Sequence, residues 1–266
     1  MGEVSSDRSH LKQQLKREAK KLGANLIGFA NVERWEEYRY TQPEYYPQSI
    51  WPWAKTVIVM AVQIFPSMIE TTPSVLYSEL YNTTNRMLDE IGYRMANLLN
   101  TLGFRAHFFP RDCYGDISVL VKKPEAPFSH VIAGYYAGLG TIGMNHALLA
   151  KEYGPRIRLV SVITDAEVAP DKMIEKDICI RCGQCVKGCP IQAFTPRNDR
   201  IAADMNKHRC ALYHQELKSE FRYPCGRCTA VCPVGADRKV YGRSSVSEAG
   251  IAHVRNFGSL NAVRDL

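Results

Sequence analysis

The sequence predicts a domain of layered α/β architecture, followed by a small domain that bound metal holds together. Helical and strand-like segments alternate over the first 165 of the 266 residues, as in proteins whose helices cover a sheet. From about residue 165 to 237, cysteines, prolines and short connections replace the long apolar segments. With 45% hydrophobic residues, the chain can bury a full core and a second, smaller one. We therefore predict domains over 1–165 and 166–240, with an extension over 241–266.

The first domain is expected to combine two helices with several strands. Glycines at 23 and 103 end the two helical patterns, which is where a helix C-terminus often needs one. Residues 147–150 are expected to form a short helix or turn. The predicted helices cover 10–22 and 79–102, and the predicted strands cover 25–30, 56–65, 104–109 and 157–164.

The chain shows no membrane-spanning or export pattern. No apolar segment approaches the roughly 20 residues that a spanning helix needs, and the polar start lacks the apolar core of a secretory signal. We expect a cytoplasmic protein that does not associate with membranes. Because the cytoplasm keeps thiols reduced, the nine cysteines predict metal ligands or free thiols before disulfides.

Eight of the nine cysteines have the spacing of two [4Fe-4S] clusters in a bacterial-ferredoxin-like domain. The first four form C-x2-C-x2-C-x3-C-P, in which the fourth cysteine ligates the neighbouring cluster. The second run is C-x2-C-x3-C-P, and the upstream Cys210 can supply its missing ligand. The crossed rule assigns Cys179, Cys182, Cys185 and Cys232 to cluster 1, and Cys189, Cys210, Cys225 and Cys228 to cluster 2.

Zinc is the alternative metal for these cysteines. Zinc sites usually use two separated C-x2-C pairs, and the ferredoxin order of eight ligands favours iron-sulfur clusters instead. The ninth cysteine, Cys113, falls outside the pattern, and a small buried hydrophobe is its default interpretation.

The charge balance indicates the kind of partner. The formal charge of +7 falls to roughly +3 once each cluster with its four thiolates contributes about −2. This mildly basic protein would suit an acidic, low-potential electron donor such as a ferredoxin or flavodoxin. It is too weakly basic to predict nucleic-acid binding.

One further segment of the first domain resembles a known family. Residues 137–145 read AGLGTIGMN, residues 153–158 read YGPRIR, and residues 163–165 read ITD. Together with 22–30 and 57–62 they resemble the corrinoid-binding domain of epoxyqueuosine reductases and reductive dehalogenases. Both families join that nitroreductase-like domain to the ferredoxin arrangement seen here.

The resemblance implies base-off cobalamin between the two domains, reduced to cob(I)alamin as the working reductant. It requires a cavity bounded by the 138–143 loop and the first cluster. The residues expected to bind the cofactor there are Gly138, Leu139, Gly140 and Gly143. The residues themselves leave open whether these glycines let backbone amides approach a ligand or only shape a turn, and no D-x-H-x-x-G segment supplies a histidine ligand for cobalt.

Arg156 is the remaining cofactor-binding candidate. It alternates with Arg158 along a predicted strand, so both side chains share one face. Arg156 could therefore pair with corrinoid carboxamides, a phosphate or a carboxylate, and a structural ion pair is an equal alternative.

Two residues are candidate proton donors. In epoxyqueuosine reductases an aspartate upstream of the glycine-rich loop has this role. Its place falls here at Pro124, so the neighbouring Glu125 is the candidate. Reductive dehalogenases use a tyrosine beside a basic side chain, and we choose Tyr81 over Tyr77 and Tyr114 for that role.

Three functions follow from these observations. The leading hypothesis is a cobalamin-dependent iron-sulfur reductase that cleaves a small substrate. The second is an electron-transfer protein that delivers electrons to a partner's corrinoid or to another redox enzyme. The third is tRNA epoxyqueuosine reduction, which is disfavoured because only 29 residues follow Asp237, too few for the helical repeats of those enzymes.

Overall fold

The computed structural model describes residues 2–110, 112–241 and 248–256. The predicted extension over 241–266 therefore lies partly outside the described residues. In the described part, no helix is both long enough and apolar enough to cross a bilayer.

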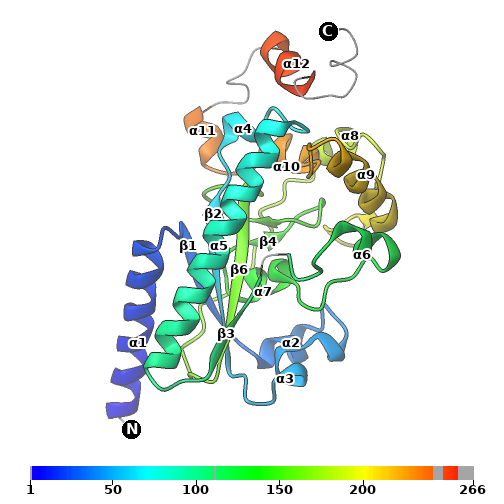
Figure 1. Ribbon diagram of the computed structural model, residues 1–266. Coiled ribbons are helices and arrows are strands. Elements are labelled where there is room, and N and C mark those ends of the chain that lie inside the picture. The colour runs from blue at the N-terminus through cyan, green and yellow to red at the C-terminus, as the bar shows by residue number, and fades with distance from the viewer. Residues whose placement is uncertain (1, 111, 242–247, 257–266) are drawn as a thin grey trace.

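A four-stranded antiparallel sheet forms the centre of the first domain (Figure 1). Its strands lie in the order β1-β2-β6-β3. Their bounds are Leu26–Asn31 for β1, Thr56–Gln63 for β2, Ala106–Phe109 for β3 and Ile157–Thr164 for β6. All four strands were predicted to within a few residues, because each is a short apolar run bounded by polar or turn residues.

Helices cover both faces of this sheet. On one face, α1 (Gly2–Lys21) and the long α5 (Val75–Thr101) pack on alternate residues of β2 such as Ile58 and Met60. On the other face, α2 (Glu33–Tyr38) and α7 (His130–Tyr136) pack on Val57 and Val59. Side chains of a strand alternate between faces, so a strand buried on both sides is apolar throughout. The layered mixed α/β architecture is confirmed.

A short hairpin corrects one expected element. Residues 147–150 contain β5 (Leu148–Leu149), which pairs with β4 (Thr141–Ile142). The expected helix or turn is wrong because the pairing with β4 and the burial of both leucines decide the backbone conformation. The remaining short elements are η1 (Pro43–Tyr45), α3 (Pro47–Ile50), α4 (Pro66–Ile69) and α6 (Ile117–Lys122).

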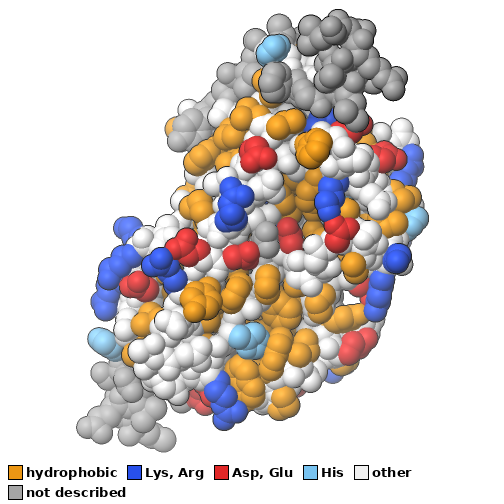
Figure 2. All heavy atoms as spheres, in the orientation of Figure 1, with side chains coloured by type: hydrophobic (Ala, Val, Ile, Leu, Met, Phe, Trp, Pro, Cys, Tyr) orange, Lys and Arg blue, Asp and Glu red, His pale blue; other side chains and the backbone are white. Residues whose placement is uncertain are grey.

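The cysteine-rich region packs at one end of the sheet (Figure 1). It contains one helix of medium length, α9 (Lys207–Ser219), and several short helices and strands. The short helices are α8 (Gln184–Lys187), α10 (Arg227–Ala230) and α11 (Asp237–Tyr241), and the strands are β7 (Phe194–Thr195) and β8 (Asp204–Met205). The last described helix is α12 (Glu248–Asn256). On the face of the molecule shown in Figure 2, acidic and basic side chains are interspersed.

Candidate redox centre and cofactor cavity

The two cysteine runs fold into matching loops. Each contains a C-G-x-C segment whose glycine, Gly183 or Gly226, has a positive φ (+70° and +63°) and caps a one-turn helix. These glycines allow the chain to turn sharply between two ligands, which a β-carbon would hinder. The helices that they begin, α8 and α10, contact each other, so the two loops lie side by side.

Cys232 lies near the thiols of the first run, and Cys189 lies near Cys210 and Cys225. Burial, together with the nearby thiols of Cys232, Cys179 and Cys182, raises the pKa of Cys185 to about 11. Burial likewise raises the pKa of Cys210 to about 11, with contributions from Cys225 and Cys189. We call Cys179, Cys182, Cys185 and Cys232 quartet 1, and Cys189, Cys210, Cys225 and Cys228 quartet 2.

The two quartets are neighbours. Burial and nearby thiols raise the pKa of Cys228 to about 12, and these thiols include Cys185 of the other quartet. Backbone N–H groups already point at several sulfurs, and the amide of Ala193 donates to Cys189 Sγ at 3.3 Å. Such hydrogen bonds stabilise thiolates and tune iron-sulfur clusters. The residues present therefore fit two adjacent clusters, although no three described His, Cys, Asp or Glu side chains lie close enough to hold a single metal ion.

The quartets differ in their surroundings. All four cysteines of quartet 2 line a cavity of about 420 Å³ that also contains Tyr81 and Arg158. In quartet 1, Cys182 is exposed at the protein surface. Quartet 2 therefore faces an internal cavity, whereas quartet 1 reaches the protein surface.

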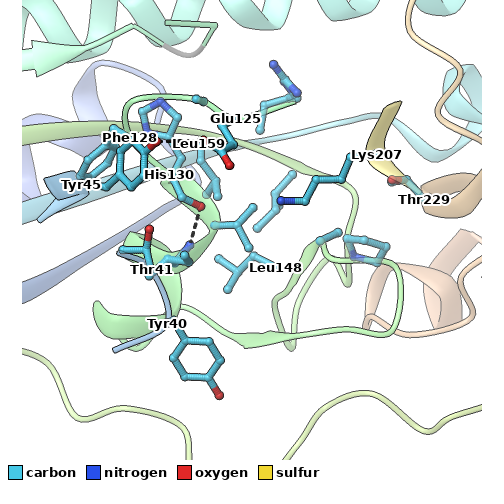
Figure 3. Close-up of a pocket in the computed structure, with 18 of the residues that line it drawn as sticks. Tyr40, Thr41, Tyr45, Glu125, Phe128, His130, Leu148, Leu159, Lys207 and Thr229 are labelled. Carbon is cyan, nitrogen blue, oxygen red and sulfur yellow. Dashed lines mark hydrogen bonds between the residues drawn. The ribbon is translucent and has the colours of Figure 1, made fainter. Parts of the chain in front are cut away.

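A larger cavity of about 640 Å³ adjoins that of quartet 2. The two cavities share Tyr77, Arg158 and Thr229. In Figure 3, Lys207 and Glu125 point into the larger cavity and Leu148 lies at its floor. The floor is apolar, with Phe128, Leu148, Ile157 and Leu159, and the rim is polar, with Thr41, Gln42 and Ser129. An apolar floor with a polar rim fits a flat macrocycle that carries amide side chains.

The glycine-rich loop at 138–143 does not line the cofactor cavity that was expected beside it. A β-carbon built on Gly138 would lie 2.4 Å from the carbonyl oxygen of Lys172, and one on Gly140 would lie 2.2 Å from that of Leu149. Gly143 is similarly close to the Leu149 side chain, and Leu139 packs in the apolar core. These four residues line neither cavity. The expected cavity between this loop and cluster 1 is therefore corrected to one beside quartet 2, bounded by the Ala147–Leu148 segment that follows the loop.

Arg156 forms a buried structural ion pair. Its fully buried guanidinium donates to both carboxylate oxygens of Asp237 at 2.6 Å. It also donates to the backbone carbonyls of Cys232 (2.9 Å) and Val234 (2.6 Å). Because these bonds engage Nε and both terminal nitrogens, the expected corrinoid contact does not match this placement. Arg156 instead joins the end of the sheet to the loop that carries a ligand of cluster 1.

Tyr81 lies in a polar network at the wall of the smaller cavity. Its hydroxyl donates to the carboxylate of Asp112 (3.0 Å) and accepts from Arg158 Nη2 (3.0 Å). The Arg158 guanidinium carbon lies 4.2 Å from the centroid of the tyrosine ring. The Tyr81 hydroxyl therefore lies between a carboxylate and a guanidinium. Asp112 and Arg158 were not among the predicted site residues, because they meet Tyr81 only through the fold.

Glu125 lies at the rim of the larger cavity. Tyr45 donates to its carboxylate at 2.9 Å, and Lys123 lies 3.4 Å away. The hydrogen bond from Tyr45, followed by that from Lys123, lowers the pKa of Glu125 below its ordinary value. Glu125 is therefore ionised at neutral pH, the opposite of what a proton donor requires.

His130 lines the larger cavity, and its burial makes the stability of the protein depend on pH. Its Nε2–H donates to the carbonyl of Pro110 (3.1 Å), so its Nδ1 accepts from the hydroxyl of Ser161 (2.8 Å). Burial lowers the pKa of His130 to about 4. The unfolded chain takes up this proton near pH 6.5, so stability is full above that pH and falls as the pH drops towards 4.

We expect the His130→Asn variant to lose this pH dependence. The histidine accounts for up to about 2 kcal/mol between pH 7 and 5, less the share that solvent screens because the ring is only partly enclosed. Chemical unfolding of wild type, His130→Asn and the exposed control His208→Asn at pH 7 and pH 5 measures it. Equal pH dependence in all three proteins would contradict the assignment.

Comparisons with known proteins agree with this arrangement. Residues 178–236, which include all eight ligand candidates, match a 4Fe-4S dicluster domain family. A tetrachloroethene reductive dehalogenase of Desulfitobacterium hafniense is 30% identical over 226 residues, covering 79% of this chain and 36% of the relative. An epoxyqueuosine reductase of Bacillus cereus is 25% identical, covering 85% of this chain and 65% of the relative.

Solved structures show the same fold. A reductive dehalogenase structure matches with a TM-score of 0.64 at 20% identity, over 94% of this chain and 34% of the other. An epoxyqueuosine reductase from Streptococcus thermophilus matches with a TM-score of 0.55, also at 20% identity, over 84% of this chain and 66% of the other. This chain thus spans about a third of the dehalogenases and just under two thirds of the Bacillus cereus reductase. Over the length given, the chain is an epoxyqueuosine reductase and reductive dehalogenase-like protein with a 4Fe-4S dicluster domain.

Proposed function

We propose that this protein is a cobalamin-dependent iron-sulfur reductase that cleaves a bond in a small substrate. The single observation that carries the proposal is the large cavity directly beside quartet 2. Electrons that arrive at the exposed cluster 1 could pass through cluster 2 to a cofactor in that cavity. A corrinoid would supply a strongly reducing cobalt centre there, and Thr41, Gln42 and Ser129 would hold its amide side chains.

A titration of anaerobically purified protein with hydroxocobalamin tests this proposal. We expect one cobalamin per chain, detected by its absorbance, in protein with intact clusters. The variant Thr41→Trp should weaken binding at least about tenfold, because an indole at the rim would occupy space that the cofactor needs. Thr101→Trp, on an exposed part of α5, is the matched control.

Two results would contradict this proposal. Failure of the wild type to bind cobalamin would make the protein an electron carrier for a partner, which was our second hypothesis. Equal binding by wild type and Thr41→Trp would place the cofactor outside this cavity.

Tyr81 is the proposed proton donor of the reaction. Its hydroxyl lies between Asp112 and Arg158 in the cavity of quartet 2, and Arg158 lies near enough to stabilise the resulting phenolate. Glu125 is not proposed for this role, which also disfavours epoxyqueuosine reduction. The physiological donor would be an acidic ferredoxin or flavodoxin.

We expect Tyr81→Phe to lower turnover by roughly 10²- to 10⁴-fold, the usual contribution of general acid catalysis. A suitable probe is 3-bromo-4-hydroxybenzoic acid, the ligand in one related dehalogenase structure. The matched control is Tyr93→Phe, because Tyr93 lies on the same helix with its side chain exposed. Release of bromide by Tyr81→Phe at the wild-type rate would rule out Tyr81 as the donor.

A further inference from the structure

A third cavity, of about 270 Å³, lies behind the loop of Cys232 and takes no part in the proposed reaction. It is formed where α4, α10, α11 and α12 meet residues 232–233. Its lining consists of Glu70, Arg227, Ala230, Val231, Cys232, Pro233, Arg238, Ile251 and Arg255. It touches Cys232 of quartet 1, and it shares Arg227 with the cavity of quartet 2.

The cavity has an excess of positive charge. Three guanidinium groups and one carboxylate line it. Glu70 pairs with Arg238 at 2.5 Å, and Arg255 donates to the backbone carbonyls of Thr71 (3.2 Å) and Glu70 (3.3 Å). The side chain of Arg227 makes no hydrogen bond or ion pair with the described residues. Two positive charges thus remain without a compensating carboxylate in the lining.

Arg238 adds a second, independent observation. Its side chain is 7% exposed, and its terminal nitrogens donate to Glu70 and to the carbonyl of Ala230. Its Nε is buried and has no hydrogen-bond partner among the described residues. A buried charged donor without an acceptor is costly, and proteins usually satisfy such a group with an ion or ordered water.

We propose that this cavity binds a small tetrahedral oxyanion, phosphate or sulfate. A dianion would balance the two excess charges and offers enough oxygens for Arg227, Arg238 and Arg255 together. The apolar Val231, Pro233 and Ile251 limit the access of water, which strengthens each charge-assisted hydrogen bond. Burial and the charge of Arg227 lower the pKa of Arg255, so an anion there would also relieve repulsion between these two arginines.

The bound anion would act on cluster 1. Cys232 lines the same cavity, and negative charge beside a cluster disfavours the electron added on reduction. We therefore expect the oxyanion to lower the reduction potential of cluster 1. Its concentration would thereby regulate how readily this cluster accepts electrons.

The test uses anaerobic holoprotein at constant ionic strength. Equilibrium dialysis with radiolabelled inorganic phosphate measures binding, with sulfate and acetate as competitors. Arg227→Gln should weaken phosphate binding roughly tenfold or more, because it removes one charge-assisted contact. Arg209→Gln is the matched control, since Arg209 also directly precedes a cysteine of quartet 2 but lies exposed on α9 outside this cavity.

The expected result is one phosphate per chain, displaced by sulfate more readily than by acetate. An EPR-monitored redox titration should show a lower potential for one cluster when phosphate is saturating. Absence of saturable binding, or equal binding by wild type and Arg227→Gln, would overturn the proposal. Stronger competition by acetate, or an unchanged potential at saturation, would also overturn it.

Discussion

Replacing Arg156 with methionine should destabilise the protein by about 3–5 kcal/mol and release the iron of cluster 1 first. The reason is that Asp237, whose side chain is 2% exposed, would remain buried without its partner. The loop of Cys232 would also lose the guanidinium that holds its carbonyl. Chemical unfolding and the rate of iron release to a chelator measure the two effects.

Two further variants distinguish the effect of the unpaired Asp237 charge from the effect of losing the donor to the Cys232 loop. In Arg156→Met/Asp237→Leu the buried carboxylate is gone, so much of the stability should return. The rapid loss of iron should persist, because the carbonyls of Cys232 and Val234 still lack their donor. Arg200→Met removes an exposed ion pair with Asp204 and should cost less than about 1 kcal/mol. Equal effects of Arg156→Met and Arg200→Met would contradict this account.

The double variant Cys189→Ala/Cys228→Ala should retain about four of eight irons per chain, whereas Cys182→Ala/Cys189→Ala should retain almost none. In the crossed assignment, the first pair removes two ligands of cluster 2, and the second removes one ligand from each cluster. Iron and sulfide analysis of anaerobically purified proteins measures this. Cys113→Ala should retain all eight irons, because the Cys113 thiol contacts the carbonyl of Phe128 (3.9 Å) and belongs to neither quartet.

The opposite pattern would show that each run ligates its own cluster. In that arrangement Cys182 and Cys189 would share one cluster, so their double variant would retain about four irons. The proximity of Cys232 to Cys185, and of Cys189 to Cys210, favours the crossed arrangement.

The sequence predicts features that depend on local spacing. The run at 157–164 is apolar throughout, and the structure has β6 over those same residues. The cysteine loops were predictable because the number of residues between ligands determines which irons they can reach. The hairpin at 147–150 was not, because the partner strand and the burial of Leu148 and Leu149 decide it.

The candidate site depends on long-range contacts that a single sequence does not show. Asp112 comes from a loop after β3, Tyr81 from α5 and Arg158 from β6, and only the fold brings them together. Arg156 and Arg158 are two residues apart on one strand, yet one is fully buried against Asp237 and the other lines both cavities. The glycines at 138 and 140 predicted that a ligand could come close to the backbone there. In the structure, they instead allow one segment of backbone to pack closely against another.

The central claim is that cluster 2 delivers electrons to a cofactor in the adjoining cavity. The most direct measurement mixes dithionite-reduced protein, freed of excess reductant, with hydroxocobalamin and follows the cobalt by stopped-flow absorbance and EPR. We predict that the wild type reduces the bound cobalt, and that Cys228→Ala binds cobalamin but reduces it far more slowly with cluster 1 intact. Reduction by Cys228→Ala at the wild-type rate would contradict the claim.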